Sequence, residues 1–374
     1  MSNVSSSNGL GKYPKLRFKG FSEPWKTIRI GEIYAERSER GAEDMKLLSV
    51  TMNDGVKMRS DIEGKDNSSE DKSNYKIVRA GDMVYNSMRM WQGANGISPW
   101  DGIVSPAYTV LKPRMPISNG FFAALFKTYR LINEFRKNSQ GMTSDTWNLK
   151  YPQIETIKTS IPTLSEQERI AEFLTSLDKR IEKQRTLVEA LKKYKRGVSN
   201  VIFAEAEHWE KAAFLDVFCT VSDKPYQVST SEYCECGTYE VVDQGKNDIV
   251  GYNDDENKVF HAVPIIVYGD HTTIIKYRNT PFIVGGDGVK LLASHTPNNL
   301  QYLYYALCQY NIQPEGYKRH FSIVKNIFIP LPSLEQQMSI AKILATIDLK
   351  IQKESALLEQ LLIQKKALLQ QFFI

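Results

Sequence analysis

One long passage occurs twice in this chain at a fixed separation. The stretch PTLSEQERIAEFLTSLDKRIEK at 162–183 returns as PSLEQQMSIAKILATIDLKIQK at 332–353, with each residue 170 positions after its counterpart. Each copy opens with a helix-start signal, because a hydroxyl residue stands three positions before a glutamate or glutamine, as Thr163 stands before Glu166. The preceding proline discourages helix any earlier. Two similar helices are therefore predicted to begin at equivalent places.

Apolar residues recur at spacings of four and three down each copy, which is typical of a coiled-coil seam. In the first helix the seam comprises Ile170, Leu174, Leu177, Ile181, Gln184, Val188, Leu191, Lys195, Val198 and Ile202. In the second helix it comprises Ile340, Leu344, Ile347, Ile351, Glu354, Leu358, Leu361, Lys365, Leu368 and Phe372. Because polar residues interrupt both seams at matching places, we expect the two helices to pair with each other.

An antiparallel pairing with Lys195 beside Glu354 and Gln184 beside Lys365 makes every remaining layer apolar. Paired residue numbers then add to 549. Such polar layers lower stability and penalise slipped registers. A helix of about forty residues spans roughly 60 Å, so the pair would act as a spacer. The alternative is that each helix packs only on its neighbouring globular domain.

The globular parts before the helices are repeated more loosely. WKTIRIGEIY from Trp25 resembles WEKAAFLDVF from Trp209, and the approaches to the two helices also match. In each part several strand-like runs precede a helix, predicted at 120–135 and at 298–310. This order is typical of an α+β domain. The chain is thus a predicted pseudo-two-fold tandem repeat, in which two long helices form an antiparallel coiled coil. We divide it into 1–160, 161–205, 206–330 and 331–374, with the helices as the second and fourth segments.

Composition excludes several classes of protein. The 374 residues are 42% apolar and 24% charged, as in a globular protein of two or more domains, and no apolar run is long enough to cross a membrane. The polar N-terminus lacks an apolar targeting core, so we expect a cytoplasmic location. A net charge of +5 permits a nucleic-acid partner without requiring one. Four scattered cysteines do not have the spacing of a zinc site.

No catalytic motif stands out in the sequence. The run GGDG at 285–288 lacks the spacing of a phosphate-binding loop, the five histidines have no metal-ligand spacing, and the Pro-Pro-aromatic motif of an amino-methyltransferase is absent. Glu63 and Lys65, with Asp54 upstream, resemble half of a metal-dependent nuclease site. Their polar, Ser- and Asp-rich context favours a solvated charge run instead. We therefore expect no catalytic residue, no metal and no cofactor in this chain.

Polar loops with side chains suited to DNA readout are the remaining signal. Arg and Lys suit guanine edges and phosphates, Asn and Gln suit adenine, and Ser and Thr suit either. The candidates in the first globular part are Arg89, Trp91, Gln92, Asn95, Ser144, Thr146, Trp147, Asn148 and Lys150. Those in the second are His271, Thr272, Lys276, Arg278, Tyr317, Lys318, Arg319 and His320.

The chain resembles the DNA-specificity subunit of type I restriction-modification systems. The resemblance covers nearly the whole length, and the element Pro-x-Leu-x-x-Gln followed by Ile-Ala, Leu, Asp and Ile carries it at both 162–181 and 332–351. In that family two target-recognition domains each read half of a split DNA sequence. Their conserved helices form an antiparallel coiled coil that sets the gap between the half-sites and docks methyltransferase subunits.

The resemblance implies several partners. Double-stranded DNA would be the ligand, two modification subunits would carry S-adenosylmethionine, and two restriction subunits would use ATP and Mg²⁺. The chain itself would catalyse nothing, although its complex would methylate adenine and cleave DNA. The alternative from another class is a structural adaptor whose coiled coil joins protein partners without reading DNA.

Overall fold

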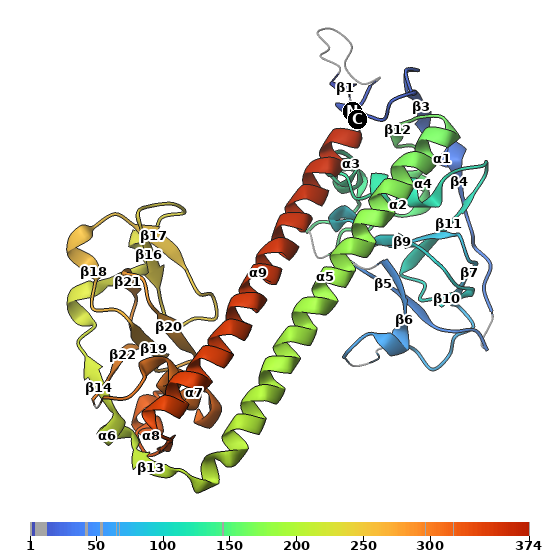
Figure 1. Cartoon of the computed structure of the whole chain (residues 1–374). Coiled ribbons are helices and arrows are strands. Elements are labelled where there is room, and N and C mark those ends of the chain that lie inside the picture. Colours follow the sequence, from blue (N-terminus) through green and yellow to red (C-terminus); the bar gives the residue numbers. More distant parts are fainter. Residues whose placement is uncertain are drawn as a thin grey trace. The chain divides into compact units, whose positions relative to one another are not determined.

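The computed structural model describes residues 2–3, 13–41, 44–52, 55–64, 66, 68–143, 146–295, 297–316 and 318–373. The chain forms two compact units, each containing one globular part and a portion of both long helices. Unit 1 comprises residues 1–184 and 357–374, and unit 2 comprises residues 185–356. The long helices are α5 (Leu164–Ala204) and α9 (Leu334–Phe372), which Figure 1 draws in green and red. Both begin two residues after the prolines of the repeated passage.

Unit 1 is built on a four-stranded antiparallel sheet of order β4-β11-β8-β9. Its strands are β4 (Tyr34–Glu36), β8 (Met83–Asn86), β9 (Asn95–Ile97) and β11 (Tyr108–Pro113). The remaining strands form pairs: β1 (Ser2–Asn3) with β2 (Leu16–Arg17), β3 (Lys26–Arg29) with β12 (Lys158–Ile161), β5 (Leu48–Thr51) with β6 (Gly55–Met58), and β7 (Lys76–Val78) with β10 (Gly102–Val104). The helices of its globular part are α1 (Ile30–Ile33), α2 (Asn119–Leu125), α3 (Tyr129–Asn138) and α4 (Tyr151–Ile154).

Unit 2 repeats this plan and enlarges one part of it. The sheet β14-β22-β19-β20 has the same order, and β13 pairs with β23 as β3 pairs with β12. A second, five-stranded sheet contains β15, β16, β17, β18 and β21. The strands are β13 (Glu210–Ala213), β14 (Phe218–Val221), β15 (Gln227–Val228), β16 (Tyr239–Val242), β17 (Gly251–Asn253), β18 (Val259–Phe260), β19 (Ile265–Gly269), β20 (Ile275–Arg278), β21 (Phe282–Gly285), β22 (Val289–Ser294) and β23 (Phe328–Leu331). The helices are α6 (Phe214–Val217), α7 (Leu300–Tyr310) and α8 (Phe321–Val324). The predicted α+β tandem repeat is confirmed.

One predicted helix is two helices. The single helix expected over 120–135 is divided into α2 and α3, because Thr128 takes extended backbone angles (φ −71°, ψ 145°). Its hydroxyl oxygen accepts a hydrogen bond from the amide of Leu131 and so caps α3. The predicted helix over 298–310 corresponds to α7, whose N-cap Asn299 accepts from the amide of Tyr302.

The glutamine of the repeated passage latches each long helix to its own globular part. In unit 1 the Gln167 amide donates to the carbonyl oxygen of Pro162 (3.0 Å) and accepts from the amide of Ser118 (3.1 Å), the N-cap of α2. In unit 2 Gln337 donates to the carbonyl of Pro332 (3.0 Å) and accepts from the amide of Asn299 (3.0 Å). Both glutamines are buried. The proline and the glutamine five positions after it therefore make the same contact in both copies, and the glutamine ties each long helix to its globular part.

The helix ends are also held alike. Phe373, after the end of α9, makes an edge contact with Trp25 in unit 1, with ring centroids 6.4 Å apart. Phe203, near the end of α5, makes the same kind of contact with Trp209 in unit 2, also at 6.4 Å. These are equivalent positions of the repeat. In each unit the hydrophobic core therefore includes an aromatic residue at or just after the end of one long helix.

Within each unit the two helix portions are antiparallel, and an ion pair joins them. Lys365 contacts Asp178 in unit 1, with Nζ 2.5 Å from Oδ1, and Lys195 contacts Asp348 in unit 2, with Nζ 2.6 Å from Oδ1. The two pairs are copies of each other, because Asp348 and Lys365 lie 170 positions after Asp178 and Lys195. Every residue of the two seams is buried or half-buried.

The aspartates that these lysines contact lie outside the predicted seam, and the seam register itself stays a prediction. The sequence placed Lys195 beside Glu354 and Lys365 beside Gln184, whereas the ion pairs join both lysines to aspartates outside the seam. A lysine stem is long enough to lie in an apolar layer while its ammonium group reaches a carboxylate near solvent. The seam positions alone therefore do not predict that Asp348 and Asp178 are the ion-pair partners.

Candidate nucleic-acid interface

Two polar loops of unit 1 are held together by backbone hydrogen bonds. One follows β8 and contains Arg89, and the other precedes α4 and contains Asn148. The amide of Leu149 donates to the carbonyl of Ser87 (2.8 Å), which ties the second loop to the first. Asn148 also exchanges two backbone hydrogen bonds with Gln140, at 2.8 and 2.9 Å. Residues that are more than fifty positions apart in the sequence therefore share one surface.

A pair of tryptophans joins the same two loops. The rings of Trp91 and Trp147 meet edge to face, with centroids 5.2 Å apart. The indole N–H of Trp91 donates to the carbonyl of Met88 (3.0 Å), which fixes the ring on its own loop. Gly93 follows with φ +88°, a backbone conformation that side-chain-bearing residues rarely adopt, and closes this turn. Neither ring is fully buried, so both loops present aromatic surface.

Two neighbouring cavities of about 280 and 460 Å³ lie in this region and share Ala107 in their walls. The smaller is lined by Asn148 and Lys150 together with Arg40 and Lys76, and the larger by Arg89 and Arg59 among others. Four arginine and lysine side chains besides Lys76 therefore surround one polar surface. Arg and Lys in such a cluster suit phosphate oxygens and guanine edges.

Lys76 has a structural role in that wall. Its ammonium group is buried, donates to the carbonyl of Tyr108 (2.8 Å) and lies 3.4 Å from a carboxylate oxygen of Glu36. Arg59 is half-buried and donates to the carbonyl of Ile62 (2.8 Å). Arg40 and Arg59 were not among the sequence candidates, because their polar segments lie far in the sequence from the candidate loops and only the fold brings them to the same cavities.

The other candidates of unit 1 differ in their exposure to solvent. Gln92 and Thr146 are exposed, whereas Asn95 is fully buried and its side-chain amide donates to the carbonyl of Gly93 (3.0 Å). Asn95 therefore shapes the turn, and we correct its assignment as a DNA contact. Ser144 lies outside the described residues.

In unit 2 two predicted contacts are buried in the interior. Lys276 is 6% exposed, and its ammonium group donates to the carbonyl oxygens of Asp243 and Asn247. Burial lowers the pKa of Lys276 below its ordinary value, an effect that the nearby Asp243 carboxylate partly opposes. Arg278 is equally buried and pairs with Glu240 and Asp248. These two cations stabilise the packing of β20 and are corrected as DNA contacts.

His320 is also part of the interior. It is fully buried, its Nε2 accepts from the amide of Glu315 (2.9 Å), and its Nδ1 lies 3.2 Å from the carbonyl oxygen of Asp270. These contacts require the tautomer that carries its proton on Nδ1. His320 therefore joins two loops, and its predicted role as a DNA contact is corrected.

The turn that contains His271 and Thr272 is held by Gln244. The Gln244 side chain accepts from the amide of His271 (3.0 Å) and donates to the carbonyl of Asp287 (2.9 Å). The Thr272 hydroxyl donates to the Gln244 carbonyl oxygen. Both candidates are half-buried. The turn is thus fixed against the loop that contains Gln244, and the side chains of His271 and Thr272 are only partly accessible to solvent.

Two exposed cations remain among the candidates of unit 2. Lys318 pairs with Glu315 at 2.5 Å, and Arg319 follows it on the surface. Tyr317 lies outside the described residues. The candidate interface of unit 2 is therefore smaller than that of unit 1.

The described residues contain no group of three or more His, Cys, Asp or Glu side chains arranged to hold a metal ion. Asp54 and Lys65 of the nuclease alternative lie outside the described residues. Among the same residues no helix is both long and apolar enough to span a membrane.

Comparison with known proteins gives a consistent result. The family model described as "Type I restriction modification DNA specificity domain" matches this chain twice, over residues 22–192 and 206–362. The type I restriction enzyme MjaVIII specificity subunit of Methanocaldococcus jannaschii is 25% identical over 350 residues, which cover 78% of each protein.

Two solved structures resemble the fold. A type I restriction-modification system S subunit from M. genitalium has a TM-score of 0.66 and 15% identity, with 96% of this chain and 99% of that chain covered. A chain from a study of complex assembly and conformational transition in a type I R-M system has a TM-score of 0.53 and 17% identity, with 92% and 96% covered. At these identities the likeness concerns the fold.

Proposed function

Because this chain belongs to the type I restriction-modification DNA specificity family and carries the family's domain twice, we propose that each globular part reads one half of a split DNA site. The observation that carries this proposal is the pair of non-overlapping family matches, one in each half of the chain. Two different readers on one repeated scaffold predict two different half-sites. The residues 1–160 and 206–330 are the proposed target-recognition domains.

In unit 1 we propose that the surface around Ala107 contacts the duplex. Arg89 and Lys150, at the two cavities, would bind phosphates or guanine edges, and Asn148 would read a base edge. Trp91 and Trp147 hold the two loops in place. In unit 2 the exposed Arg319 and Lys318 and the turn at His271 and Thr272 are the remaining proposed contacts. This division separates side chains that touch DNA from those that position them.

The coiled-coil segments 161–205 and 331–374 have a second proposed role. They would set the number of base pairs between the half-sites and dock two modification subunits, which carry S-adenosylmethionine for adenine methylation. Two restriction subunits that use ATP and Mg²⁺ would join the complex. This chain would supply specificity and no catalytic group. The cytoplasmic location remains a prediction.

Salt-dependent DNA binding tests the reading role. The complex with modification subunits should bind its specific duplex with an affinity that falls as salt rises, because phosphate contacts release counterions. Arg89→Ala and Lys150→Ala should each weaken binding and reduce the steepness of that salt dependence by about one phosphate contact. Tyr129→Ala, which alters an exposed residue away from the cavities, is the matched control.

A structural adaptor is the competing function. An adaptor would bind the same modification subunits, yet its complex would show no preference for any sequence. Equal affinity for specific and scrambled duplexes, with Arg89→Ala and Lys150→Ala behaving as the control does, would favour the adaptor over the reader.

A further inference from the structure

Residues 13–22 cover part of the surface of unit 1. Arg17 donates from Nε and Nη2 to the two carboxylate oxygens of Glu166, both at 2.7 Å. Glu166 is in the first turn of α5, and both side chains are buried. A buried ion pair with two hydrogen bonds fixes this segment on the helix.

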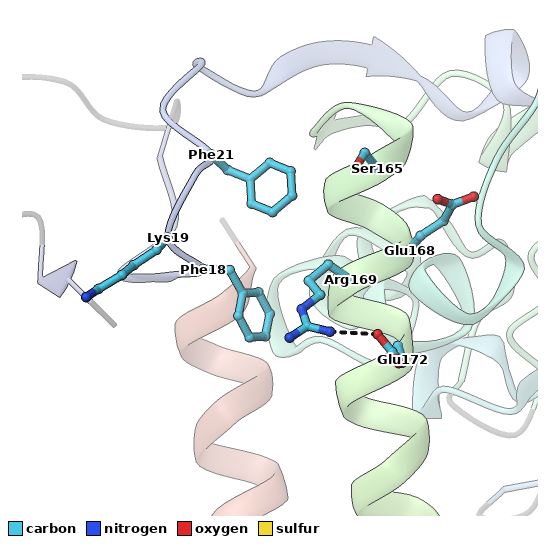
Figure 2. Close-up of a pocket in the computed structure, with 7 residues that line it drawn as sticks. All are labelled: Phe18, Lys19, Phe21, Ser165, Glu168, Arg169 and Glu172. Atoms are coloured by element: carbon cyan, nitrogen blue, oxygen red, sulfur yellow. Dashed lines mark hydrogen bonds and ion pairs between the residues drawn. The ribbon is translucent and has the colours of Figure 1, made fainter.

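A groove of about 710 Å³ borders the same segment, and Figure 2 shows Phe18 and Phe21 there beside Arg169 of α5. The Phe18 ring centroid lies 5.8 Å from that of Phe173 and 5.3 Å from that of Phe372. The Arg169 guanidinium lies 5.4 Å from the Phe18 ring centroid. Phe18 and Phe21 are both half-buried, so the chain itself covers much of the apolar surface beside this groove.

Met142 is different, because no described residue covers it. Its side chain is 100% exposed, more than any other large apolar side chain among the described residues. An apolar side chain left in water gains free energy when it is buried. Single exposed apolar residues are nevertheless common on protein surfaces, so exposure alone indicates no function. The position and the support of Met142 are therefore what an inference must rest on.

The loop that carries Met142 borders the proposed DNA surface. Gln140 and Asn148, on either side of Met142 in the sequence, exchange two backbone hydrogen bonds, and Asn148 lines the cavity of about 280 Å³. Trp147 contacts Trp91 of the neighbouring loop. Met142 therefore lies beyond the base of a loop that is itself part of the cationic surface.

The neighbouring loop places apolar side chains next to a cation in the same way. Met88 is 39% exposed and lines the cavity of about 460 Å³ together with Arg89. The Trp91 indole donates to the Met88 carbonyl and so keeps an aromatic ring beside it. Cations suit the phosphates of a duplex, whereas apolar side chains suit its bases. This surface thus offers partners for both parts of DNA.

The backbone at Met142 is held in a tight turn. Gly141 has φ +142°, and a Cβ there would lie 2.6 Å from the carbonyl oxygen of Thr146, so glycine is required. The Thr146 hydroxyl accepts from the Thr143 amide (3.1 Å) and donates to the Thr143 carbonyl (2.9 Å). Insertion between stacked bases benefits from such a support, because a mobile loop loses conformational entropy on binding.

Unit 2 has a packed side chain at the equivalent position. Ile312, 170 residues after Met142, is partly buried against the core of that unit. The loop over 311–320 before α8 is also two residues shorter than the loop over 139–150 before α4. We therefore expect the two half-sites to be treated differently.

We propose that Met142 inserts between two neighbouring base pairs of the half-site that unit 1 reads. This inference deepens the reading role proposed above and rests on it. Apolar side chains, methionine among them, enter base steps of bound duplexes, unstack them and kink the DNA. The unbranched, flexible methionine side chain adapts to such a gap. Because pyrimidine–purine steps unstack most easily, Met142 selects such a step without a hydrogen bond to any base.

Fluorescence of 2-aminopurine tests the proposal in the complex of the full chain with its modification subunits. The analogue replaces one purine at a time in the specific duplex, and its emission rises when it is unstacked. The half-site of unit 1 is the one that stays unchanged when residues 206–330 are exchanged. We expect a rise of about twofold or more at one step of that half-site, separate from the methylated adenine. Met142→Ala should abolish this rise, and Met142→Leu, which keeps a long apolar side chain, should retain it.

Met115→Ala is the matched control and should leave the rise unchanged. Met115 is 40% exposed and follows the end of β11, whereas Tyr108 at the start of that strand lines the cavity of about 460 Å³. The proposal is overturned if no step apart from the methylated adenine brightens, or if the rise persists in Met142→Ala. It is also overturned if Met142→Ala weakens assembly with the modification subunits, since the side chain then lies at a protein interface. A wild-type complex that binds specific and scrambled duplexes equally would instead contradict the reading role itself.

Discussion

Units 1 and 2 share the contacts between each long helix and its globular part, and they differ in the globular parts themselves. Gln167 and Gln337 share the proline carbonyl and a helix N-cap amide as partners at nearly the same distances, and Gln337 also donates to the Asn298 side chain. The ion pairs of Lys365 and Lys195 join residues at equivalent positions of the repeat. In contrast, unit 2 has an added five-stranded sheet, and its candidate DNA residues lie partly in the interior. The repeat has thus kept the contacts that connect a reader to its helix while the reader itself has changed.

The largest expected difference between the units lies at the first turn of the long helices. Glu166→Ala leaves Arg17 buried without its partner and should lower the free energy of unfolding of unit 1 by about 3–5 kcal/mol. Gln336→Ala, at the equivalent position, removes an exposed capping contact with Ser333 and should cost about 1 kcal/mol or less. Urea titration followed by tryptophan fluorescence suits this test, because four of the five tryptophans are in unit 1. Equal losses in the two variants would contradict the comparison.

The repeated latch should respond equally in both units. Gln167→Leu and Gln337→Leu each leave a backbone amide and a carbonyl without the glutamine partner, so each should destabilise its unit by about 1–3 kcal/mol. Hydrogen exchange at the amides of Ser118 and Asn299 measures the two losses separately. Gln→Glu at either position should cost more than Gln→Leu, because it buries a carboxylate against the proline carbonyl oxygen. A loss confined to one unit would show that the latch is not a shared joint.

The smallest expected effects are at the paired lysines. The Lys365 and Asp178 side chains are partly exposed, so Lys365→Met should cost about 1 kcal/mol or less. Lys195→Met should cost somewhat more, because the Lys195 ammonium also lies 5.1 Å from the Tyr305 ring centroid and Asp348 accepts from the Tyr305 hydroxyl. Double-mutant cycles with Asp178→Asn and Asp348→Asn give the coupling energies. A larger coupling energy in unit 1 would contradict this ranking.

The scaffold could be predicted because its signals are periodic. The seam positions follow from the spacing of apolar residues alone, and their burial agrees with that pattern. The partners of Lys195 and Lys365 could not be predicted in the same way, because Asp348 and Asp178 lie beside the seam and a lysine stem reaches past its own layer. Likewise, the division of one expected helix at Thr128 depends on a cap that competes locally with a continuous apolar run.

The candidate interface was harder to predict. Trp91, Trp147, Asn148 and Lys150 could be chosen from the sequence because each stands on a polar loop, but only the fold shows that Trp91 contacts Trp147 and that Asn148 and Lys150 line one cavity. Lys276 and Arg278 belong to a strand with alternating burial, in which Ile275 and Tyr277 face the other side toward the core that contains α7. Both faces of that strand are covered, so its cations are paired inside. The acids that pair with them, Glu240, Asp243 and Asp248, come from another part of the sequence, and no local pattern identifies them.

The most direct test of the account is an exchange of one reader. Residues 206–330 are replaced by the corresponding segment of another member of the family, the chimera is assembled with its modification subunits, and the methylated sites are determined genome-wide. We predict that one half-site changes while the other half-site and the spacing between them stay the same. A change in both half-sites, or an altered spacing with both half-sites retained, would contradict the claim that two independent readers stand on one repeated scaffold.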